Sequence, residues 1–335
     1  YIMRKSIIYL LFLIVVASCT QQKQHESFCV KEGSFDETKV LNVSDSIEME
    51  DMFDLLSWKI SSNRICFVTG GLSNNFLSVY SYPVCEKLFD YGEIGQGPYE
   101  FITLNSGDAV AENMLLYDIM GRKLVELSFG DDSLRVFKSL PLYNDEKGLC
   151  EPFTFISQIK GDKYLMKVDG ADSSYWDIAD LAQSKILGSY KNPIRKKDSS
   201  YTPFDFIQYI SDSTLVVAYK YIDRIEFYSI ADDEIKPKFL LGKNKDQSDI
   251  KDYNYLMQYY LSVVARSGSI LCLKSSDGTE SGDIIEVYDI NGESKMKYLL
   301  EKGVNSINID AEGHIIGYVP NINKTILYRF MEKND

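Results

Sequence analysis

The chain contains two histidines, His25 and His314, and this limits the chemistry that its sequence can support. Zinc sites combine His and Cys ligands at short spacings, and neither an HExxH pattern nor a CxxC pair occurs. A Ser-His-Asp triad would have to use His314, and no serine stands in a GxSxG elbow. His314 follows Glu312-Gly313, which is typical of a hairpin turn. The sequence therefore offers no catalytic residue, metal-ligand set or cofactor motif that can be named.

Carboxylates are the remaining reactive groups, because the chain holds 49 Asp and Glu. Paired catalytic carboxylates need no sequence motif, so this chemistry stays open. The acidic loop 276–283 is a calcium candidate, but it lacks the ordered ligand spacing of an EF-hand, and a solvated turn explains it better. Asp118, Asp177 and Asp289 recur at the ends of strand-like segments, where we expect them to cap turns.

The first residues have the pattern of an export signal. Arg4 and Lys5 precede an apolar run from Ile7 to Ala17, which is too short for a membrane-spanning helix of about 20 residues. A short basic region, a short apolar run and small residues after it predict a secretory signal peptide over residues 1–18. Polar residues follow without periodicity, so we expect a flexible tether over 19–37 and a folded domain over 38–335.

The end of this signal, Val16-Ala17-Ser18-Cys19, resembles the lipobox of bacterial lipoproteins. The resemblance implies cleavage after Ser18 and lipid on Cys19, which would anchor the mature chain to a membrane; the alternative is an ordinary secretory signal with a chance cysteine. Two or more acyl chains hold a protein stably at a membrane. By the sorting rules of such lipoproteins, Thr20 in place of Asp implies the outer membrane. The missing acidic cluster after Cys19 favours a periplasm-facing position over the cell surface.

The charge of the chain argues against binding to nucleic acid. The whole chain has 36 Lys and Arg against 49 Asp and Glu, and removal of a signal containing Arg4 and Lys5 leaves 34 against 49, a net charge of −15. Phosphate-binding surfaces need clustered basic residues. The one basic cluster, 195–197, is followed at once by Asp198 and fits a solvated loop.

Five cysteines remain after Cys19, an odd number that cannot all pair in an oxidising compartment. We expect most to be small buried residues and leave a Cys66–Cys85 bridge open; the five are Cys29, Cys66, Cys85, Cys150 and Cys272.

Short apolar runs divided by turn residues fill the chain past residue 38, and 24 Tyr add to a composition that favours strands. Only 249–261 has helical spacing. Aromatic residues end what we interpret as the third strand of a repeated unit, at positions 80, 117, 176, 228, 288 and 328, with a mean spacing close to 50. Repeats of this length predict an all-β fold, a six-bladed β-propeller of four-stranded antiparallel blades, rather than a β-sandwich or two β domains. Residues 38–50 would close the ring as the outer strand of the last blade.

One motif follows the first unit: Gly92-Glu-Ile-Gly95-Gln-Gly97-Pro98-Tyr-Glu100-Phe101. It resembles the GxxGxGPxEF signature of the TolB-like six-bladed β-propeller lipoproteins, and the lipobox and the repeat fit that family. The resemblance implies a six-bladed propeller and carries no agreed catalytic residues. Physically, Gly95 and Gly97 would permit unusual backbone angles, Glu100 would accept bonds from loop amides, and Phe101 would anchor the loop. A structural connection between blades explains the motif better than a ligand-binding loop at a propeller mouth.

Two aromatic segments form a candidate binding surface if they are exposed, and core packing is the alternative. Their residues are Tyr201, Phe204, Phe206, Tyr253, Tyr255, Tyr259 and Tyr260. We expect an envelope module that binds a ligand or a protein, peptide or glycan partner. The alternatives are a propeller hydrolase, lactonase or lyase with an axial carboxylate or Ca²⁺-assisted site, and a purely structural envelope protein.

Overall fold

Every regular element in the described part of the chain is a β-strand, which confirms the expected all-β class. In these residues no helix is long and apolar enough to cross a membrane. The computed structural model describes residues 27–332 except 51–54, 62, 71–73, 98–99, 108–112, 130–133, 143–152, 170–173, 193–205, 212, 244–256 and 322–323. The signal peptide 1–18, Cys19, His25 and the basic cluster 195–197 lie outside the described residues.

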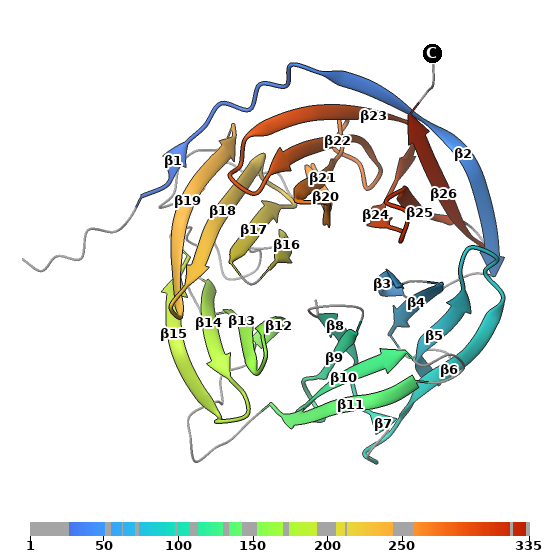
Figure 1. Ribbon diagram of the computed structural model, residues 1–335. Helices are drawn as coiled ribbons and strands as arrows, with labels where there is room; N and C mark the ends of the chain where they lie inside the picture. Colours follow the sequence, from blue (N-terminus) through green and yellow to red (C-terminus); the bar gives the residue numbers. More distant parts are fainter. Residues whose placement is uncertain are drawn as a thin grey trace, which may run out of the picture.

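The strands form sheets arranged around a common centre, the arrangement of a propeller (Figure 1). Most neighbouring strands of a sheet pair antiparallel, and in each unit the chain order starts at the strand nearest the centre. The first sheet is β3 (Leu55–Ser61), β4 (Arg64–Thr69), β5 (Asn75–Ser81), β6 (Lys87–Ile94) and the short β7 (Glu100–Phe101), which pairs parallel to β6. The second is β8 (Asn105–Gly107), β9 (Met114–Asp118), β10 (Lys123–Phe129) and β11 (Leu134–Pro141).

Two further separate sheets continue the ring. The third is β12 (Phe153–Lys160), β13 (Lys163–Asp169), β14 (Ser174–Asp180) and β15 (Lys185–Lys191), and the fourth is β16 (Phe206–Ile210), β17 (Thr214–Tyr219), β18 (Arg224–Ala231) and β19 (Glu234–Gly242), extended by β1 (Cys29–Val30).

The rest of the ring is one eight-stranded sheet. Its order is β20 (Tyr260–Arg266), β21 (Ser269–Lys274), β22 (Gly282–Asp289), β23 (Ser294–Val304), β2 (Thr38–Glu50), β26 (Lys324–Glu332), β25 (Ile315–Asn321) and β24 (Ser306–Ile309). Tight turns connect its hairpins, and Gly292 and Gly313 there adopt φ of +67° and +85°, a region that favours glycine.

The N-terminal segment runs along the outside of the ring (Figure 1). Strand β1 pairs parallel to β19, and β2 then pairs parallel to β23 over 38–41 and antiparallel to β26 over 41–50. The expected pairing of residues 38–50 with the last strands of the chain is thus found. Part of the range expected as a tether also packs against the ring. Phe28 is 7% exposed and packs edge-to-face on Tyr228. Contacts with the propeller therefore begin ten residues before the expected domain boundary at residue 38.

The apolar core consists of six clusters of buried residues in the described part of the chain, and each lies between two neighbouring groups of strands. The fully buried Trp176, for example, packs from β14 against the apolar residues of the fourth sheet. A four-stranded sheet cannot cover both of its own faces, so neighbouring sheets bury each other's faces around the ring.

The aromatic repeat found in the sequence is correct for five of its six members. Tyr80, Trp176, Tyr228, Tyr288 and Tyr328 lie on the third strand of a four-strand unit counted from the centre. Tyr117 lies on β9, a second strand, and this misplacement explains the uneven spacings on either side of it. The helix expected over 249–261 falls mostly outside the described residues, and at its end Tyr260 begins strand β20.

Four cysteines lie in the described part, and all four are free. The Cys66–Cys85 bridge left open by the sequence is therefore not formed. Cys66 and Cys272 are fully buried in β4 and β21, as expected for small core residues, whereas Cys29 on β1 is exposed. Cys150 lies outside the described residues.

Candidate functional site

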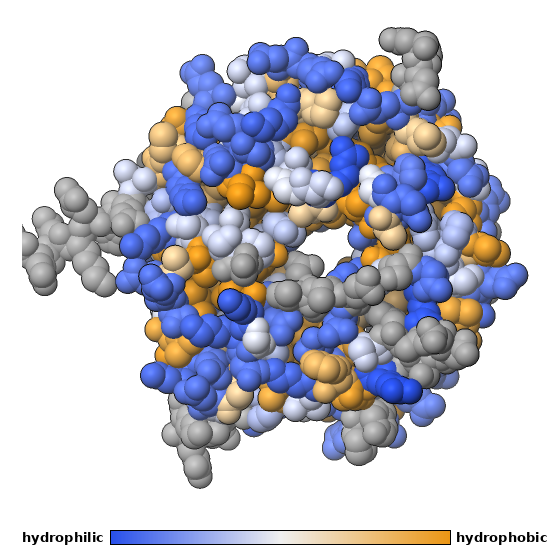
Figure 2. Space-filling model, in the orientation of Figure 1, coloured by the Kyte–Doolittle hydropathy of each residue, from blue (hydrophilic) through white to orange (hydrophobic). Residues whose placement is uncertain are grey.

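The strands nearest the centre, β3, β8, β12, β16, β20 and β24, surround a central channel of about 690 Å³. Figure 2 shows its opening near the middle of one face of the ring. Cavities of roughly 300–1,000 Å³ accept small-molecule ligands. Its described wall combines hydroxyl and amide groups with aliphatic and aromatic side chains.

Small polar side chains recur on these inner strands and tie them to one another. The indole Nε1 of Trp58 donates to Oγ of Ser306 over 2.7 Å, and Nδ2 of Asn308 donates to the carbonyl of Trp58 over 2.9 Å, which joins β3 to β24. The hydroxyls of Ser57 and Ser106 bond each other between β3 and β8. Ser262 on β20 bonds the backbone of Ile307 on β24. The hydroxyls thus hold the channel wall in place.

Gln208 on β16 differs from these residues. Its side chain is 8% exposed and lies in the channel wall, yet neither its amide nitrogen nor its amide oxygen has a hydrogen-bond partner. A buried amide left without partners costs about 1–3 kcal/mol of stability. Buried polar groups are nearly always hydrogen-bonded, so an exception beside a cavity is where a ligand or ordered water would bind.

The charged residues of the described channel wall are both cationic. They are Lys59 on β3 and Lys167 on β13, and no carboxylate lines the described part of the channel. Three aromatic residues, Trp58, Phe155 and Tyr318, supply apolar surface. The part of the wall that the structure describes therefore shows no converging acids of the kind that an axial carboxylate or Ca²⁺ site would need.

The motif loop has a structural explanation. Oε2 of Glu100 accepts a hydrogen bond from the backbone N–H of Gly97 over 2.8 Å, as expected. A Cβ on Gly95 would overlap that carboxylate, and one on Gly97 would lie 3.0 Å from its Cδ. The missing Cβ at Gly95 and Gly97 thus leaves room for the observed position of the Glu100 carboxylate, and neither glycine has the positive φ expected from the sequence. The residue that has one is Gly92, at +79°.

The described motif residues lie at the outer edge of the first sheet, and none of them lines the channel. Phe101 is fully buried against Phe76 and Tyr91, so it anchors the loop as expected. Lys123 donates to the carbonyls of Gly97 and Glu100, which ties the loop to the second sheet. Burial lowers the pKa of Lys123. A groove of about 890 Å³ lies beside the loop, and Pro98 lies outside the described residues.

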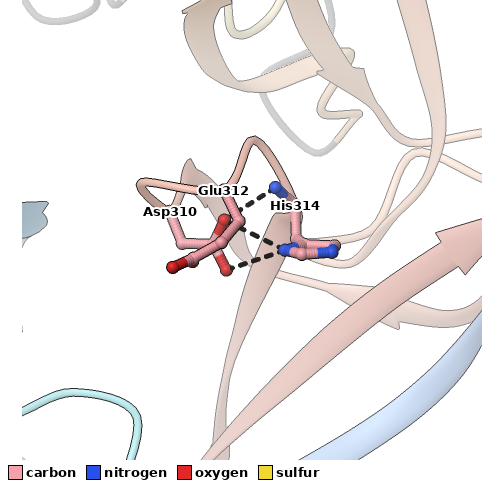
Figure 3. A group of neighbouring side chains, drawn as sticks. All are labelled: Asp310, Glu312 and His314. Atoms are coloured by element: carbon pink, nitrogen blue, oxygen red, sulfur yellow. Dashed lines mark hydrogen bonds and ion pairs between the residues drawn. The ribbon is translucent and has the colours of Figure 1, made fainter. Parts of the chain in front are cut away.

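Asp310, Glu312 and His314 gather at the turn between β24 and β25 (Figure 3). Three residues of this kind can hold a metal ion, but Nη2 of Arg329 lies 2.7 Å from Nδ1 of His314 and 3.2 Å from Oδ2 of Asp310. Nδ1 of His314 also lies 3.2 Å from both carboxylate oxygens of Asp310, so the histidine, the carboxylate and the guanidinium already bond one another. Asp310 also accepts bonds from the His314 backbone N–H and from the Tyr82 hydroxyl. The cluster holds a turn in place, which agrees with the interpretation of His314 as a turn residue.

The other carboxylates singled out in the sequence bond to nearby backbone and hydroxyl groups. Asp118 accepts from the N–H groups of Ile102, Thr103 and Gly121, and Asp289 from those of Asn291 and Glu293, so both cap turns. Asp177 instead lies within β14 and accepts a bond from a serine of β15.

The acidic loop 276–283 uses its carboxylates in the same way. Asp277 accepts from Ser275 and Thr279, and Asp283 accepts from Ser276. The hydrogen bond from the Thr279 backbone lowers the pKa of Asp277. This is the geometry of a solvated turn.

The aromatic segments do not form one exposed surface in the described part of the chain. Tyr260 is 1% exposed and packs in the core between the fourth sheet and strands β20–β22 of the eight-stranded sheet. Its hydroxyl lies within hydrogen-bond distance of the buried Asp223 and Glu286. Tyr259 is half-buried against the same core. Phe206 begins β16. Tyr201, Phe204, Tyr253 and Tyr255 lie outside the described residues.

The class of protein that the fold defines is an all-β propeller, and two solved structures share it. One is a Bacteroides fragilis protein thought to be exported, with a TM-score of 0.56, 14% identity, and coverage of 92% of this chain and 100% of its own. Another is a Bacteroides vulgatus member of the DUF4221 family, with a TM-score of 0.58, 11% identity, and coverage of 88% and 98%. At these identities the likeness shows the fold. No family model and no curated protein sequence matches the chain.

Proposed function

We propose that this chain is an envelope lipoprotein whose propeller binds a small ligand in its central channel. The observation that carries the proposal is the unbonded, buried amide of Gln208 in the wall of a ligand-sized cavity. Rigid inner strands hold this wall, and binding sites on such elements are well positioned.

The propeller in this proposal has six blades and resembles the TolB-like lipoproteins. The eight-stranded sheet then counts as two blades, β20–β23 and β24–β26 with β2, joined by parallel pairing over residues 38–41 only. A ring has as many interfaces as blades, and the six apolar clusters of the described residues support that count. Four strands per blade fit the usual blade architecture.

Lipid on Cys19 would hold the ring at the outer membrane, facing the periplasm. The lipobox-like sequence supports this, and so does the fold shared with a protein thought to be exported. A Cys19→Ser variant should leave the membrane fraction and appear as soluble protein, whereas a Cys29→Ser variant should stay membrane-bound. Retention of the Cys19→Ser protein in outer-membrane fractions would contradict a lipid anchor at this residue.

Native mass spectrometry of the mature protein, released from envelopes by mild detergent, tests ligand binding. We expect a small molecule bound in one copy, and its mass and fragmentation would tell a glycan or peptide from another ligand. Ser106→Phe narrows the channel and should remove this molecule, while Ser34→Phe on the exposed N-terminal segment should not. If the Ser106→Phe protein retains the small molecule, the ligand binds outside the channel. If the wild-type protein carries a protein partner and no small molecule, a protein-binding module is favoured.

A further inference from the structure

We infer that the central channel selects a neutral, flat ligand that carries a hydrogen-bond donor and an acceptor side by side, as the edge of a lactam or a primary amide does. This inference rests on the proposed ligand-binding function and names the class of ligand. Two features of the described wall lead to it: the amide of Gln208, which has no partner, and the apolar side chains on either side of it.

The side chain of Gln208 has an unusual hydrogen-bonding state for a buried amide. It is 8% exposed, and among the described residues neither its Nε2 nor its Oε1 has a partner. Gln158 on β12 is also 8% exposed, but its Nε2 donates to the carbonyl of Gly161 over 2.8 Å. Buried polar groups are nearly always hydrogen-bonded. Gln158 is therefore the ordinary case, and Gln208 is the exception that leaves two hydrogen-bonding positions unused.

The two unused atoms of Gln208 differ in kind, and this decides the class of ligand. An amide nitrogen donates hydrogen bonds, and an amide oxygen accepts them. A carboxylate would bond the nitrogen and bring a second acceptor to the oxygen, whereas an ammonium group would bond the oxygen alone. A ligand edge with one donor and one acceptor forms two hydrogen bonds with the same amide. A flip of the amide exchanges its two atoms and leaves this requirement unchanged.

The burial of the Gln208 amide strengthens this preference. A hydrogen bond usually contributes little to binding, because both groups give up bonds to water when they form it. The amide atoms of Gln208 are already removed from solvent in the free protein and lack partners among the described residues. The protein therefore gives up little when these two bonds form. The ligand must place its polar edge against β16 to reach both atoms, which favours a flat group.

The channel wall on either side of Gln208 is apolar. Ile207 precedes Gln208 on β16, and Phe155 on β12 and Leu261 on β20 line the channel from the neighbouring inner strands. All three apolar residues are half-buried, so each keeps some surface that a ligand can cover. An aromatic ring that carries the amide edge would bury this surface while its polar edge bonds Gln208.

Probes that share one ring and differ in their polar edge test the inference, measured by ligand-detected NMR with the mature protein in detergent and with detergent alone as the blank. Benzamide carries a donor and an acceptor, dimethylbenzamide and benzoate carry acceptors alone, and benzylamine carries donors alone. We expect benzamide to bind about tenfold more tightly than each of the other three. Equal or tighter binding of any of the three, or no benzamide binding at millimolar concentration, would overturn the inference.

Substitution of the two buried glutamines assigns the selectivity to Gln208. Gln208→Met keeps the length of the side chain and removes the amide, so benzamide should bind no better than dimethylbenzamide. The same variant should resist urea better in the free state, because an unbonded buried amide is lost. Gln158→Met is the matched control: it should leave benzamide binding unchanged and lower the resistance to urea, because it breaks the bond to Gly161. A preference for benzamide that survives Gln208→Met would come from size and would overturn the inference.

These outcomes separate the two proposals. If the wild-type protein shows no preference for benzamide while Ser106→Phe still removes the endogenous molecule, the channel binds a ligand of another class and only the amide inference fails. If Ser106→Phe changes neither the endogenous ligand nor benzamide binding, the channel is not the binding site and both proposals fail.

Discussion

The hydroxyl of Tyr82 donates to Oδ2 of Asp310 over 3.0 Å, a buried bond between residues 228 positions apart. Tyr82 follows β5 in the first sheet, and Asp310 follows β24 at the end of the chain. The bond therefore crosses the junction where the two ends of the ring meet, beside the apolar cluster that contains Tyr82 and Tyr318.

Tyr82→Phe should destabilise the protein by about 1.5–3 kcal/mol, the usual range for a buried hydrogen bond to a charged group. Phenylalanine keeps the packing of the aromatic ring, so the loss of stability measures the contribution of the Tyr82–Asp310 hydrogen bond. Urea unfolding measures the change. Lys324→Ala, which removes the exposed pair with Glu48, should change the free energy of unfolding by less than about 0.5 kcal/mol. An equal effect of both substitutions would contradict a special role for the Tyr82–Asp310 bond.

Gly95→Ala should destabilise the protein by about 1–3 kcal/mol, because its Cβ overlaps the carboxylate of Glu100. Glu100→Ala should be destabilising too, since it leaves the Gly97 N–H without its acceptor. The double variant should be less destabilised than the sum of the two, because the carboxylate that meets the new Cβ is gone. A strictly additive double-mutant cycle would show that Gly95 is required for a different reason.

Stability should fall steeply in alkaline solution. Burial, and then the negative charge of Glu226 or Glu286, raises the pKa values of Tyr219, Tyr228, Tyr260 and Tyr288 well above 10.0. A raised pKa in the folded state means that the stabilisation is complete below the unfolded value of about 10 and is lost as the pH rises above it.

Urea unfolding at increasing pH, together with tyrosinate absorbance, measures this effect. The free energy of unfolding should be flat near neutrality, as far as these tyrosines are concerned, and should decrease above about pH 10. Tyr260→Phe should reduce the slope. Ionisation of all tyrosines with ordinary pKa values and no loss of structure would contradict the burial of these phenols.

The described cysteines should differ in their rate of reaction with thiol reagents, because they differ in burial. Burial raises the pKa of Cys66 to about 12 and that of Cys85 to about 11. The thiolate is the reactive form, so both should react slowly with maleimide at neutral pH, and the exposed Cys29 should react fast. A Cys150→Ser background keeps the measurement to the described cysteines. Rapid labelling of Cys66 in the folded protein would show that β4 opens readily.

Much of this fold could be predicted from the sequence, because short apolar runs and Asn-Gly or Glu-Gly turns are local signals. The prediction that Tyr117 ends a third strand was wrong, because an aromatic residue fits a second strand as well as a third. For Tyr260 the sequence left an exposed surface and core packing open, because aromatic type does not tell an exposed ring from one that bonds buried acids, and core packing is what the structure shows. Phe28 was missed because its partner Tyr228 is distant in sequence.

An axial site was considered from the sequence, but the residues of the channel wall were not predicted. This wall is built from ordinary residues such as Ser57, Ser106, Ser262, Ser306 and Gln208, which match no chemical motif. Each stands on the first strand of a four-strand unit, so a polar residue recurs on the inner strand of several units. That recurrence is the signal from which the channel could have been found, once the units were aligned in phase.

The strands that run along the outside of the ring determine when the ring can close during folding. Strand β2 is made early, but its partner β26 is the last strand of the chain, and Leu41 pairs with Glu332. The ring therefore cannot close before β26 is available, and until then the sheets keep unpaired edges that could pair with the wrong strand. A chain that lacks β26 would leave residues 41–50 of β2 without their antiparallel partner, so truncation before Lys324 should leave the ring open.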